Sequence, residues 1–224
     1  MTTRREAGAR LLAATAIAFA PFVARSSDRG ALALPAPPID DRTSLAAALK
    51  MRRSTREYAQ RGIPDELLSG LLWAAYGVNR PSGERTAPYW RHVMVLDIYV
   101  ARADGVWLYE PKTHALVPHL PEDIRGATGR QDFVAKAPVN LVYVAHGERM
   151  MDVSAEEGRL YASVDTGFVG QKVYLFCAAA GLATVFRASI DYPLLERAMK
   201  LPGTQFVTFA QTVGYPAANV GGAG

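Results

Sequence analysis

The sequence has almost no cysteine: Cys177 is the only one in 224 residues. A single thiol excludes an intramolecular disulfide and a thiolate zinc site, so stability has to come from an apolar core or from oligomerisation. Cys177 lies in the apolar run 174–180, which has no neighbouring basic residue or histidine to activate a thiolate. We therefore expect Cys177 to be a small buried packing residue.

The sequence also lacks the common motifs for nucleotide, acyl-transfer and zinc chemistry. It contains no glycine-rich P-loop, no Gly-x-Gly-x-x-Gly fingerprint after a strand, no Gly-x-Ser-x-Gly elbow and no His-Glu-x-x-His pair. Its four histidines are scattered over expected loops and strand ends and do not have the spacing of metal ligands. We therefore expect no metal site.

Outside the amino terminus the sequence has almost no excess of one sign of charge. The whole chain has 25 Lys and Arg against 21 Asp and Glu, a net charge of +4. Residues 1–30 hold five of the basic and two of the acidic side chains, which leaves the remainder close to neutral. A body without a basic field is poorly suited to polyanions, so we expect no nucleic-acid partner.

The amino-terminal 33 residues have the order of an export signal. Arg4 and Arg5 precede an apolar stretch over 11–24, and small-x-small cleavage patterns follow. The stretch is shorter than the roughly 20 apolar residues that cross a bilayer, which favours cleavage over a membrane anchor. We expect a leader over 1–33, twin-arginine type slightly ahead of the general type, and an exported, periplasmic protein. An uncleaved start, which would leave the protein cytoplasmic, is the alternative.

The body shows an irregular alternation of helical and strand-like patterns over residues 43–216. Residues 34–42 are proline-rich and predict a stiff extended linker, and residues 217–224 predict a flexible tail. Predicted helices cover 43–50, 64–76, 154–180 and 192–200, and predicted strands cover 93–101, 106–110, 115–120, 138–145, 183–190 and 205–213. Ser154 with Glu157 is a capping-box signature at the start of the long helix. The irregular order predicts an α+β domain rather than a doubly wound sheet.

One segment combines charge with hydroxyl groups. Residues 52–58 read Arg-Arg-Ser-Thr-Arg-Glu-Tyr, with three guanidiniums and two hydroxyls within five residues. Arginine binds phosphate oxygens in a bidentate manner and serine adds a short hydrogen bond, so the segment suits a dianion. A solvated basic patch with an intrahelical ion pair explains the same residues about equally well.

A series of short motifs lies in order along the body. They are Arg-Arg-Ser-Thr-Arg-Glu-Tyr (52–58), Leu-Trp-Ala-Ala-Tyr-Gly-Val-Asn-Arg (72–80), Arg-Thr-Ala-Pro (85–88), Thr-Gly-Arg-Gln-Asp-Phe (128–133), Asp-Thr-Gly-Phe-Val-Gly-Gln (165–171), Gly-Leu-Ala-Thr-Val (181–185) and Gln-Thr-Val-Gly-Tyr-Pro (211–216). Each motif is weak alone, but their order and spacing are specific. From about Leu34 to Pro216 the chain resembles the nitroreductase-like FMN flavoproteins, in particular the branch related to dehydrogenases that form thiazole and oxazole rings in peptides.

The resemblance implies a nitroreductase-like α+β fold with a central, mostly antiparallel sheet flanked by helices, and a homodimer with FMN at its interface. It implies an FMN-dependent oxidoreductase that transfers hydride or electrons in two steps, through flavin N5, to a small organic acceptor such as a nitroaromatic or a quinone. NAD(P)H or another donor would reduce the flavin in the same pocket. The flavin carries the chemistry, so no side chain is assigned as catalytic.

The same resemblance implies which residues hold the cofactor. Those that would bind the phosphate and ribityl chain are Arg52, Arg53, Ser54 and Arg56. Those that would border the isoalloxazine ring are Pro88, Tyr89 and His92, and Gln131 would bond the polar edge of the ring. The turn whose backbone N–H groups would face flavin N5 and O4 consists of Arg187, Ala188 and Ser189.

The chain departs from the family pattern at several of these positions. The family usually has serine and asparagine where Tyr89 and His92 stand, and often a basic residue after the Gly-Tyr-Pro element, where this chain has 217–219 Ala-Ala-Asn. Larger side chains narrow the pocket, and a missing cation weakens phosphate binding. The alternatives are therefore a flavin-binding pseudoenzyme and a peptide-azoline dehydrogenase. Export argues against the peptide-azoline dehydrogenase, because such peptides normally mature inside the cell. Export would also separate the protein from NAD(P)H, which is cytoplasmic.

Overall fold

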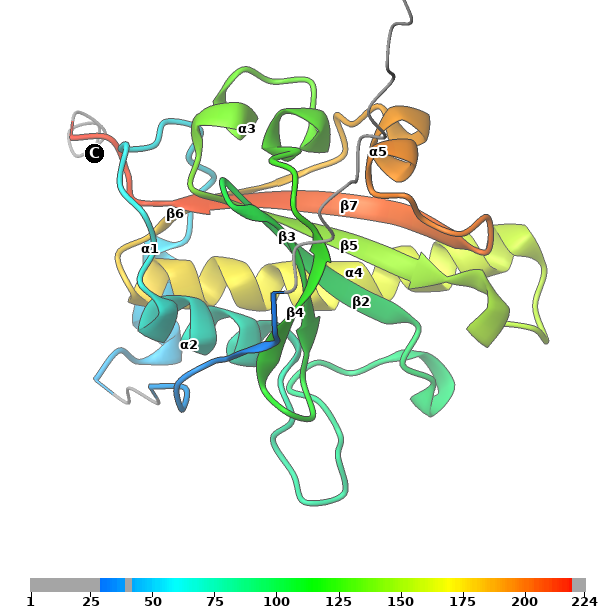
Figure 1. The fold of residues 1–224 in the computed structure, drawn as a ribbon. Helices are drawn as coiled ribbons and strands as arrows, with labels where there is room; N and C mark the ends of the chain where they lie inside the picture. The colour runs from blue at the N-terminus through cyan, green and yellow to red at the C-terminus, as the bar shows by residue number, and fades with distance from the viewer. Residues whose placement is uncertain (1–28, 39–41, 219–224) are drawn as a thin grey trace, which may run out of the picture.

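A seven-stranded sheet forms the centre of the molecule (Figure 1). The computed structural model describes residues 29–38 and 42–218. The strands are β1 Leu32–Ala33, β2 Leu96–Arg102, β3 Gly105–Glu110, β4 Ala115–Leu120, β5 Val139–His146, β6 Ala183–Arg187 and β7 Gln205–Gly214. They lie in the order β1-β4-β3-β2-β5-β7-β6, and every pairing is antiparallel. This arrangement confirms the predicted α+β class with an antiparallel sheet.

Helices cover both faces of the sheet. They are α1 Leu45–Met51, α2 Asp65–Tyr76, α3 Phe133–Lys136, α4 Ala155–Ala179 and α5 Tyr192–Ala198, with short 3-10 helices at Trp90–His92, Arg125–Thr128 and Gly147–Arg149. Figure 1 shows α2 and α4 against one face and α3 and α5 against the other. The sheet is therefore the middle of three layers, and its central strands have no face in water.

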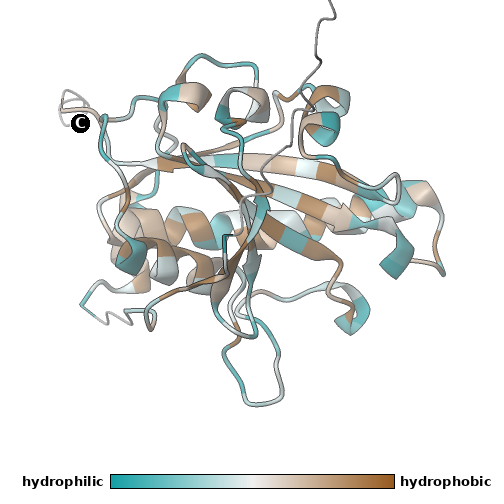
Figure 2. Cartoon of the chain, in the orientation of Figure 1, coloured by the Kyte–Doolittle hydropathy of each residue, from teal (hydrophilic) through white to brown (hydrophobic). Residues whose placement is uncertain are grey.

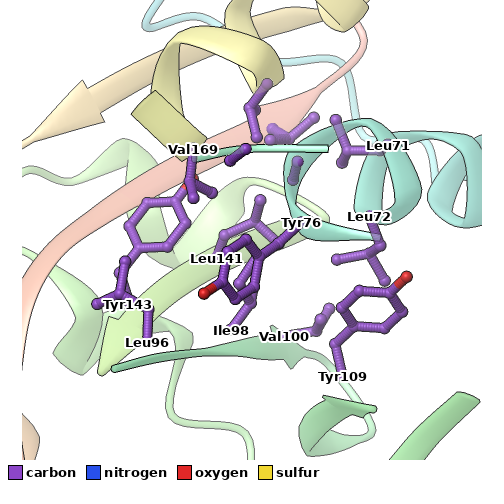
Figure 3. Packing of buried hydrophobic residues seen from close by; sticks show 14 of the residues in the cluster. Leu71, Leu72, Tyr76, Leu96, Ile98, Val100, Tyr109, Leu141, Tyr143 and Val169 are labelled. Atoms are coloured by element: carbon purple, nitrogen blue, oxygen red, sulfur yellow. The ribbon is translucent and has the colours of Figure 1, made fainter. Parts of the chain in front are cut away.

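The central strand β5 shows the consequence of this double covering, because all eight of its residues are buried. Leu141 and Tyr143 belong to the apolar cluster that includes residues of α2 and α4 (Figure 3). Val142 and Val144, which point the other way, belong to a second cluster with Leu195 of α5. Figure 2 shows the same pattern, since the strands between the helical layers are rich in hydrophobic residues. A strand buried on both faces is largely apolar, and the two polar residues of β5, Asn140 and His146, are both hydrogen-bonded.

The long helix α4 begins and ends where the sequence predicts. The Ser154 side chain accepts a hydrogen bond from the Glu157 backbone N–H, and the Glu157 carboxylate accepts one from the backbone N–H of Ser154, which confirms the capping box. Cys177 lies on the buried side of α4 and has no solvent exposure. Burial raises the pKa of its thiol, so Cys177 is a neutral packing residue, as expected.

Two predicted strands are shorter than expected, for identifiable reasons. β2 begins at Leu96 rather than at residue 93, because the preceding residues Trp90–His92 form a 3-10 helix, in which the Trp90 carbonyl accepts a hydrogen bond from the Val93 N–H. β6 ends at Arg187 rather than at residue 190, because the chain turns there and Ile190 N–H donates to the Ala188 carbonyl. Both differences lie at the expected cofactor residues.

The amino-terminal end of the described chain is part of the sheet. Leu32 and Ala33 form β1 against β4, and the buried Leu34 donates its N–H to the His114 carbonyl. Leu32 and Ala33, the expected end of the leader, are therefore paired with the sheet, and the leader with its boundary stays a prediction. Residues 1–28, which carry the expected export signal, lie outside the described residues.

The linker and the tail are also in contact with the domain where they are described. The Pro35 carbonyl accepts a hydrogen bond of 2.6 Å from the Ser69 hydroxyl of α2, so the extended segment packs along that helix. At the other end, Ala217 N–H donates to the Glu57 carbonyl. The predicted flexible tail can begin only after Ala217, and residues 219–224 lie outside the described residues.

Close packing of α4 on β6 gives a stability prediction. A Cβ atom on Gly170 would lie 2.5 Å from the ring of Phe186, whereas one on Gly158 of the same helix would lie 3.5 Å from the nearest atom, in Met150. We expect Gly170→Ala to lower the free energy of unfolding by about 1–3 kcal/mol through overpacking. Gly158→Ala should raise it by about 0.5–1 kcal/mol, because alanine favours helix. Urea unfolding measures both; a stabilising Gly170→Ala would contradict the packing.

Candidate functional site

The segment that follows α1 runs along the edge strand β6. Arg52 ends α1 as its C-cap, and Thr55 N–H donates to the Thr184 carbonyl at 2.9 Å. The Tyr58 hydroxyl then donates to the Thr55 carbonyl at 2.7 Å. These contacts fix residues 52–58 as an extended chain, so the intrahelical ion pair that offered an alternative explanation of this segment does not form.

Tyr174 of α4 organises the phosphate-binding residues expected in this segment. Its hydroxyl lies 2.7 Å from Ser54 Oγ and accepts a hydrogen bond from the Phe186 N–H at 2.9 Å. The Arg52 guanidinium lies over the Tyr174 ring, 5.2 Å from its centroid. Sequence reasoning missed Tyr174, because it stands at the start of an apolar helical run and has no motif of its own.

The three guanidiniums of the segment are available to an anion. Arg53 and Arg56 are exposed and Arg52 is half-buried. No described carboxylate lies within ion-pair distance of any of the three. Arginines that have no acidic partner and stand beside a serine hydroxyl are suited to a phosphate.

The turn after β6 meets Gln131 on the same side of the molecule. Arg130 N–H donates to the Ser189 carbonyl at 3.0 Å. A Cβ atom on Gly129 would collide with Arg187 Nη1 and lie 3.1 Å from Gln131 Oε1, so only glycine allows this approach. Gln131 Oε1 is buried without a hydrogen-bond partner, and among the described residues the N–H groups of Ala188 and Ser189 have no acceptor.

Arg187, the first residue of that turn, carries a buried positive charge. Arg187 is 4% exposed, and its guanidinium donates to Thr212 Oγ1 at 3.0 Å, to the Thr128 carbonyl at 2.8 Å and to Asn140 Oδ1 at 3.1 Å. All three acceptors are neutral. Burial lowers the pKa of Arg187 to about 10, which leaves it charged at neutral pH. Sequence reasoning missed these acceptors, because they come from three separate segments of the chain.

The residues expected around the ring lie on the loop before β2. Trp90 N–H donates to Asp165 Oδ2 of α4 at 2.9 Å, and the Trp90 ring stacks on Tyr161 at 5.3 Å. Tyr89 meets His92 edge to face at 6.2 Å, and Pro88 and His92 are exposed. His92 has a φ of 59°, a conformation that asparagine and histidine adopt more readily than most residues.

The structure therefore divides the predicted site residues into two groups. The basic half contains Arg52, Arg53, Ser54, Arg56, Gln131, Arg187, Ala188 and Ser189. The aromatic half contains Pro88, Tyr89 and His92. The basic half is attached to α4 at Tyr174 and the aromatic half at Asp165, nine residues earlier, which is roughly 13 Å along the helix axis. On α4, which runs from Ala155 to Ala179, Asp165 lies near the middle of the helix and Tyr174 lies closer to its C-terminal end.

No group of three or more His, Cys, Asp or Glu side chains among the described residues is placed to hold a metal ion. Within residues 29–38 and 42–218, no helix has the length and apolarity needed to cross a membrane.

Comparisons with known proteins agree on one family. The sequence profile of the nitroreductase family matches residues 49–215. A nitroreductase homologue from Methanocaldococcus jannaschii is 36% identical over 151 residues, which cover 63% of this chain and 76% of that protein. The crystal structure of a nitroreductase homologue from Ralstonia eutropha JMP134 is 37% identical with a TM-score of 0.81, covering 86% of this chain and 92% of that one.

A more distant structure shares the fold. The NADPH:FMN oxidoreductase of Vibrio harveyi, solved in complex with NAD⁺, has 20% identity and a TM-score of 0.58, with 78% of this chain and 70% of that chain covered. The antiparallel sheet with helices on both faces is thus the nitroreductase fold. The chain belongs to the nitroreductase family and is a nitroreductase-family oxidoreductase.

The buried carboxylate of Asp165 gives a pH-dependent prediction. Burial raises the pKa of Asp165, and the Trp90 N–H offsets only part of this. A folded pKa above the unfolded value of about 4 means that stability present below pH 4 is lost as the pH rises through the folded pKa. Asp165→Asn keeps an oxygen for Trp90 N–H without the charge. We expect it to be more stable than wild type at pH 7, with the difference vanishing toward pH 4, in urea unfolding at several pH values. Lower stability at pH 7 would contradict this.

Proposed function

We propose that this protein is an FMN-dependent oxidoreductase of nitroreductase type that reduces a small organic acceptor such as a nitroaromatic or a quinone. The observation that carries the proposal is the donor and acceptor set of the basic half. Guanidiniums without acidic partners and the Ser54 hydroxyl suit a phosphate, and the unpartnered Gln131 Oε1 with the free N–H groups of Ala188 and Ser189 suits the polar edge of a flavin. The residues present fit the cofactor.

FMN, when bound, supplies reversible hydride transfer through its N5. The protein would bind the cofactor and set the electrostatic field around it. Arg52, Ser54 and Arg56 bind and neutralise the phosphate. The Arg187 charge lies below the turn that carries the free N–H groups, and it favours added negative charge at that end of the site. Hydrogen bonds hold the Ser54 hydroxyl and the turn of Ala188 and Ser189 before any ligand arrives, so these donors cost little reorganisation.

A homodimer would complete the site. The attachment points of the aromatic half and the basic half lie roughly 13 Å apart along α4 in one chain, and a partner chain would bring a second aromatic half to the basic half. α4 carries an exposed apolar stripe, formed by Leu160, Val164 and Phe168 at helical spacing. These side chains are 59%, 47% and 46% exposed, and Phe168 lies between the two attachment points. Leu45 and Leu49 of α1, which packs against α4, are also exposed. Exposed apolar side chains at this spacing suit a helix-mediated interface.

The electron donor and the compartment belong to the same proposal. The fold is shared with an NADPH:FMN oxidoreductase solved with NAD⁺, which supports a nicotinamide donor for a protein in the cytoplasm. Export through the predicted leader would place the protein in the periplasm, where another donor or oxidase activity would be required. Sequencing the amino terminus of the protein purified from its native host decides between these two settings.

The alternatives to this proposal are a peptide-azoline dehydrogenase and a flavin-binding pseudoenzyme that has lost turnover. The half-buried Tyr89 and Trp90 occupy the loop that would border the ring, which is the observation that favours a flavin-binding pseudoenzyme. A single experiment separates the cases. The purified protein should take up FMN and turn yellow, bleach with NADPH or dithionite, and regain its colour with a nitroaromatic or a quinone. Failure to take up FMN would overturn the proposed function, whereas uptake without turnover would indicate the pseudoenzyme.

The basic half gives a prediction on cofactor affinity. Arg56→Gln and Ser54→Ala each remove one donor to the phosphate, and hydrogen bonds to charged groups contribute about 1.5–3 kcal/mol. We expect each variant to bind FMN about tenfold more weakly or worse, measured by quenching of flavin fluorescence, with an unchanged circular dichroism spectrum. Lys200→Gln, which removes an exposed charge paired with Glu122, is the control and should bind as wild type does. Unchanged affinity in both test variants would refute the phosphate assignment.

The apolar stripe of α4 gives a prediction on assembly. Phe168→Glu places a charge in the proposed interface, so we expect a monomer by light scattering and loss of bound FMN, because the partner chain would no longer bring its aromatic half to the basic half. Leu194→Glu, at a similarly exposed position on α5, is the matched control and should stay dimeric. A dimer that survives Phe168→Glu would place the interface elsewhere.

A further inference from the structure

A pocket of about 350 Å³ lies beside β2 and β3, and none of the residues expected to bind the cofactor lines it. Its walls come from the end of α2, the loop before β2, and the two strands. Arg85 is the basic residue at its buried side, and we call it the Arg85 pocket. Figure 3 shows two of its wall residues, Tyr76 on α2 and Tyr109 on β3, on either side of the strand residues Ile98 and Val100.

Arg85 is a buried cation whose hydrogen bonds are incomplete. It is 6% exposed, and its Nε and Nη1 have no hydrogen-bond partner. Its Nη2 reaches only the thioether sulfur of Met94, at 3.3 Å, which is a weak acceptor. The hydroxyl of Tyr76, in the same pocket, is also buried without a partner. Among the described residues five buried side-chain N or O atoms lack partners, and three of them are these.

The acidic residues of the pocket are paired with groups other than Arg85. Asp97 Oδ2 bonds His146 Nε2 at 2.7 Å, and its other oxygen lies 3.7 Å from Arg149. Glu110 accepts a hydrogen bond from the Lys112 backbone N–H at 3.0 Å. No described carboxylate is within ion-pair distance of Arg85. A buried guanidinium without a counter-charge is energetically unfavourable, and an anion that enters the pocket relieves it.

We propose that the Arg85 pocket binds a small organic carboxylate, whose oxygens accept hydrogen bonds from Arg85 and the Tyr76 hydroxyl. The apolar part of the ligand would lie along the aliphatic wall, which includes Ile98 and Leu108. A monoanion fits better than phosphate, because the lining holds three cations, on Arg85, Lys112 and Arg149, against two carboxylates, on Asp97 and Glu110, which leaves one positive charge uncompensated. Burial raises the pKa of Tyr76, so its phenol keeps the proton that it would donate.

The pocket is distinct from the proposed cofactor site but shares a wall with the aromatic half. The Tyr76 ring meets the Tyr89 ring edge to face, with centroids 6.4 Å apart. A carboxylate held by Tyr76 would therefore lie behind the side chain that is expected to border the ring. Binding needs no residue of the basic half, so it can be measured on the full chain with or without FMN, and its failure would not affect the proposed function.

Calorimetric titration with benzoate and with benzamide tests the proposal. The two probes have the same shape, and only benzoate carries the charge. We expect benzoate to bind at millimolar concentrations or below and benzamide about tenfold more weakly or worse, because charge-assisted hydrogen bonds are about twice as strong as neutral ones. Tyr76→Phe should weaken benzoate several-fold and Arg85→Gln should abolish its binding. Arg61→Gln, an exposed arginine stacked on Tyr215 outside the pocket, is the control and should leave the affinity unchanged.

Other outcomes overturn the proposal. Equal affinities for benzoate and benzamide, or no benzoate binding at millimolar concentrations, would mean that the pocket holds water only. Tighter binding of inorganic phosphate than of benzoate would overturn the carboxylate assignment. If Arg85→Gln does not fold, Tyr76→Phe and the charge-conserving Arg85→Lys decide, and wild-type affinity in both would also overturn it.

Discussion

The buried guanidinium of Arg187 is the interaction on which the arrangement of the basic half depends. It begins on β6 and donates to Thr212 of β7, Asn140 of β5 and the Thr128 carbonyl of the 3-10 helix Arg125–Thr128. A desolvated guanidinium is costly unless its N–H groups are paired, so these hydrogen bonds hold the three segments in one geometry. A hydrogen bond from Arg130 to Ser189 joins the loop that carries Gln131 to the turn after β6, so the unpartnered polar groups of the loop and the turn are near one another.

The length of α4 is the second constraint. Tyr174 fixes the basic half and Asp165 fixes the loop of the aromatic half, and the helix between them keeps the halves apart in one chain. The exposed apolar side chains of the same helix indicate where a second chain would dock. The proposed homodimer and the proposed cofactor site are therefore one hypothesis, since the same helix governs both.

Buried polar atoms without partners mark both sites proposed for this protein. Gln131 Oε1 lies in the basic half, and Arg85 with the Tyr76 hydroxyl lies in the Arg85 pocket. Polar groups buried in a folded protein are nearly always paired, so unpaired ones indicate places where a ligand or water completes the bonding. Tyr76 and Tyr89 are in contact, so the two sites are neighbours across one pair of aromatic rings.

The sequence by itself determined most of the longer helices and strands, the α+β class, the family and the burial of Cys177, because apolar periodicity, the Ser154–Glu157 capping box and ordered motifs are local signals. It also predicted residues 52–58 and the turn 187–189 as cofactor-binding segments. Only the tertiary structure decided that Leu32 and Ala33 form a strand, that Tyr174 holds Ser54, and that neutral acceptors surround Arg187. It also separated the two halves and left Arg85 unpaired. These facts depend on which distant segments meet, and burial, not local pattern, decides whether a polar group there finds a partner.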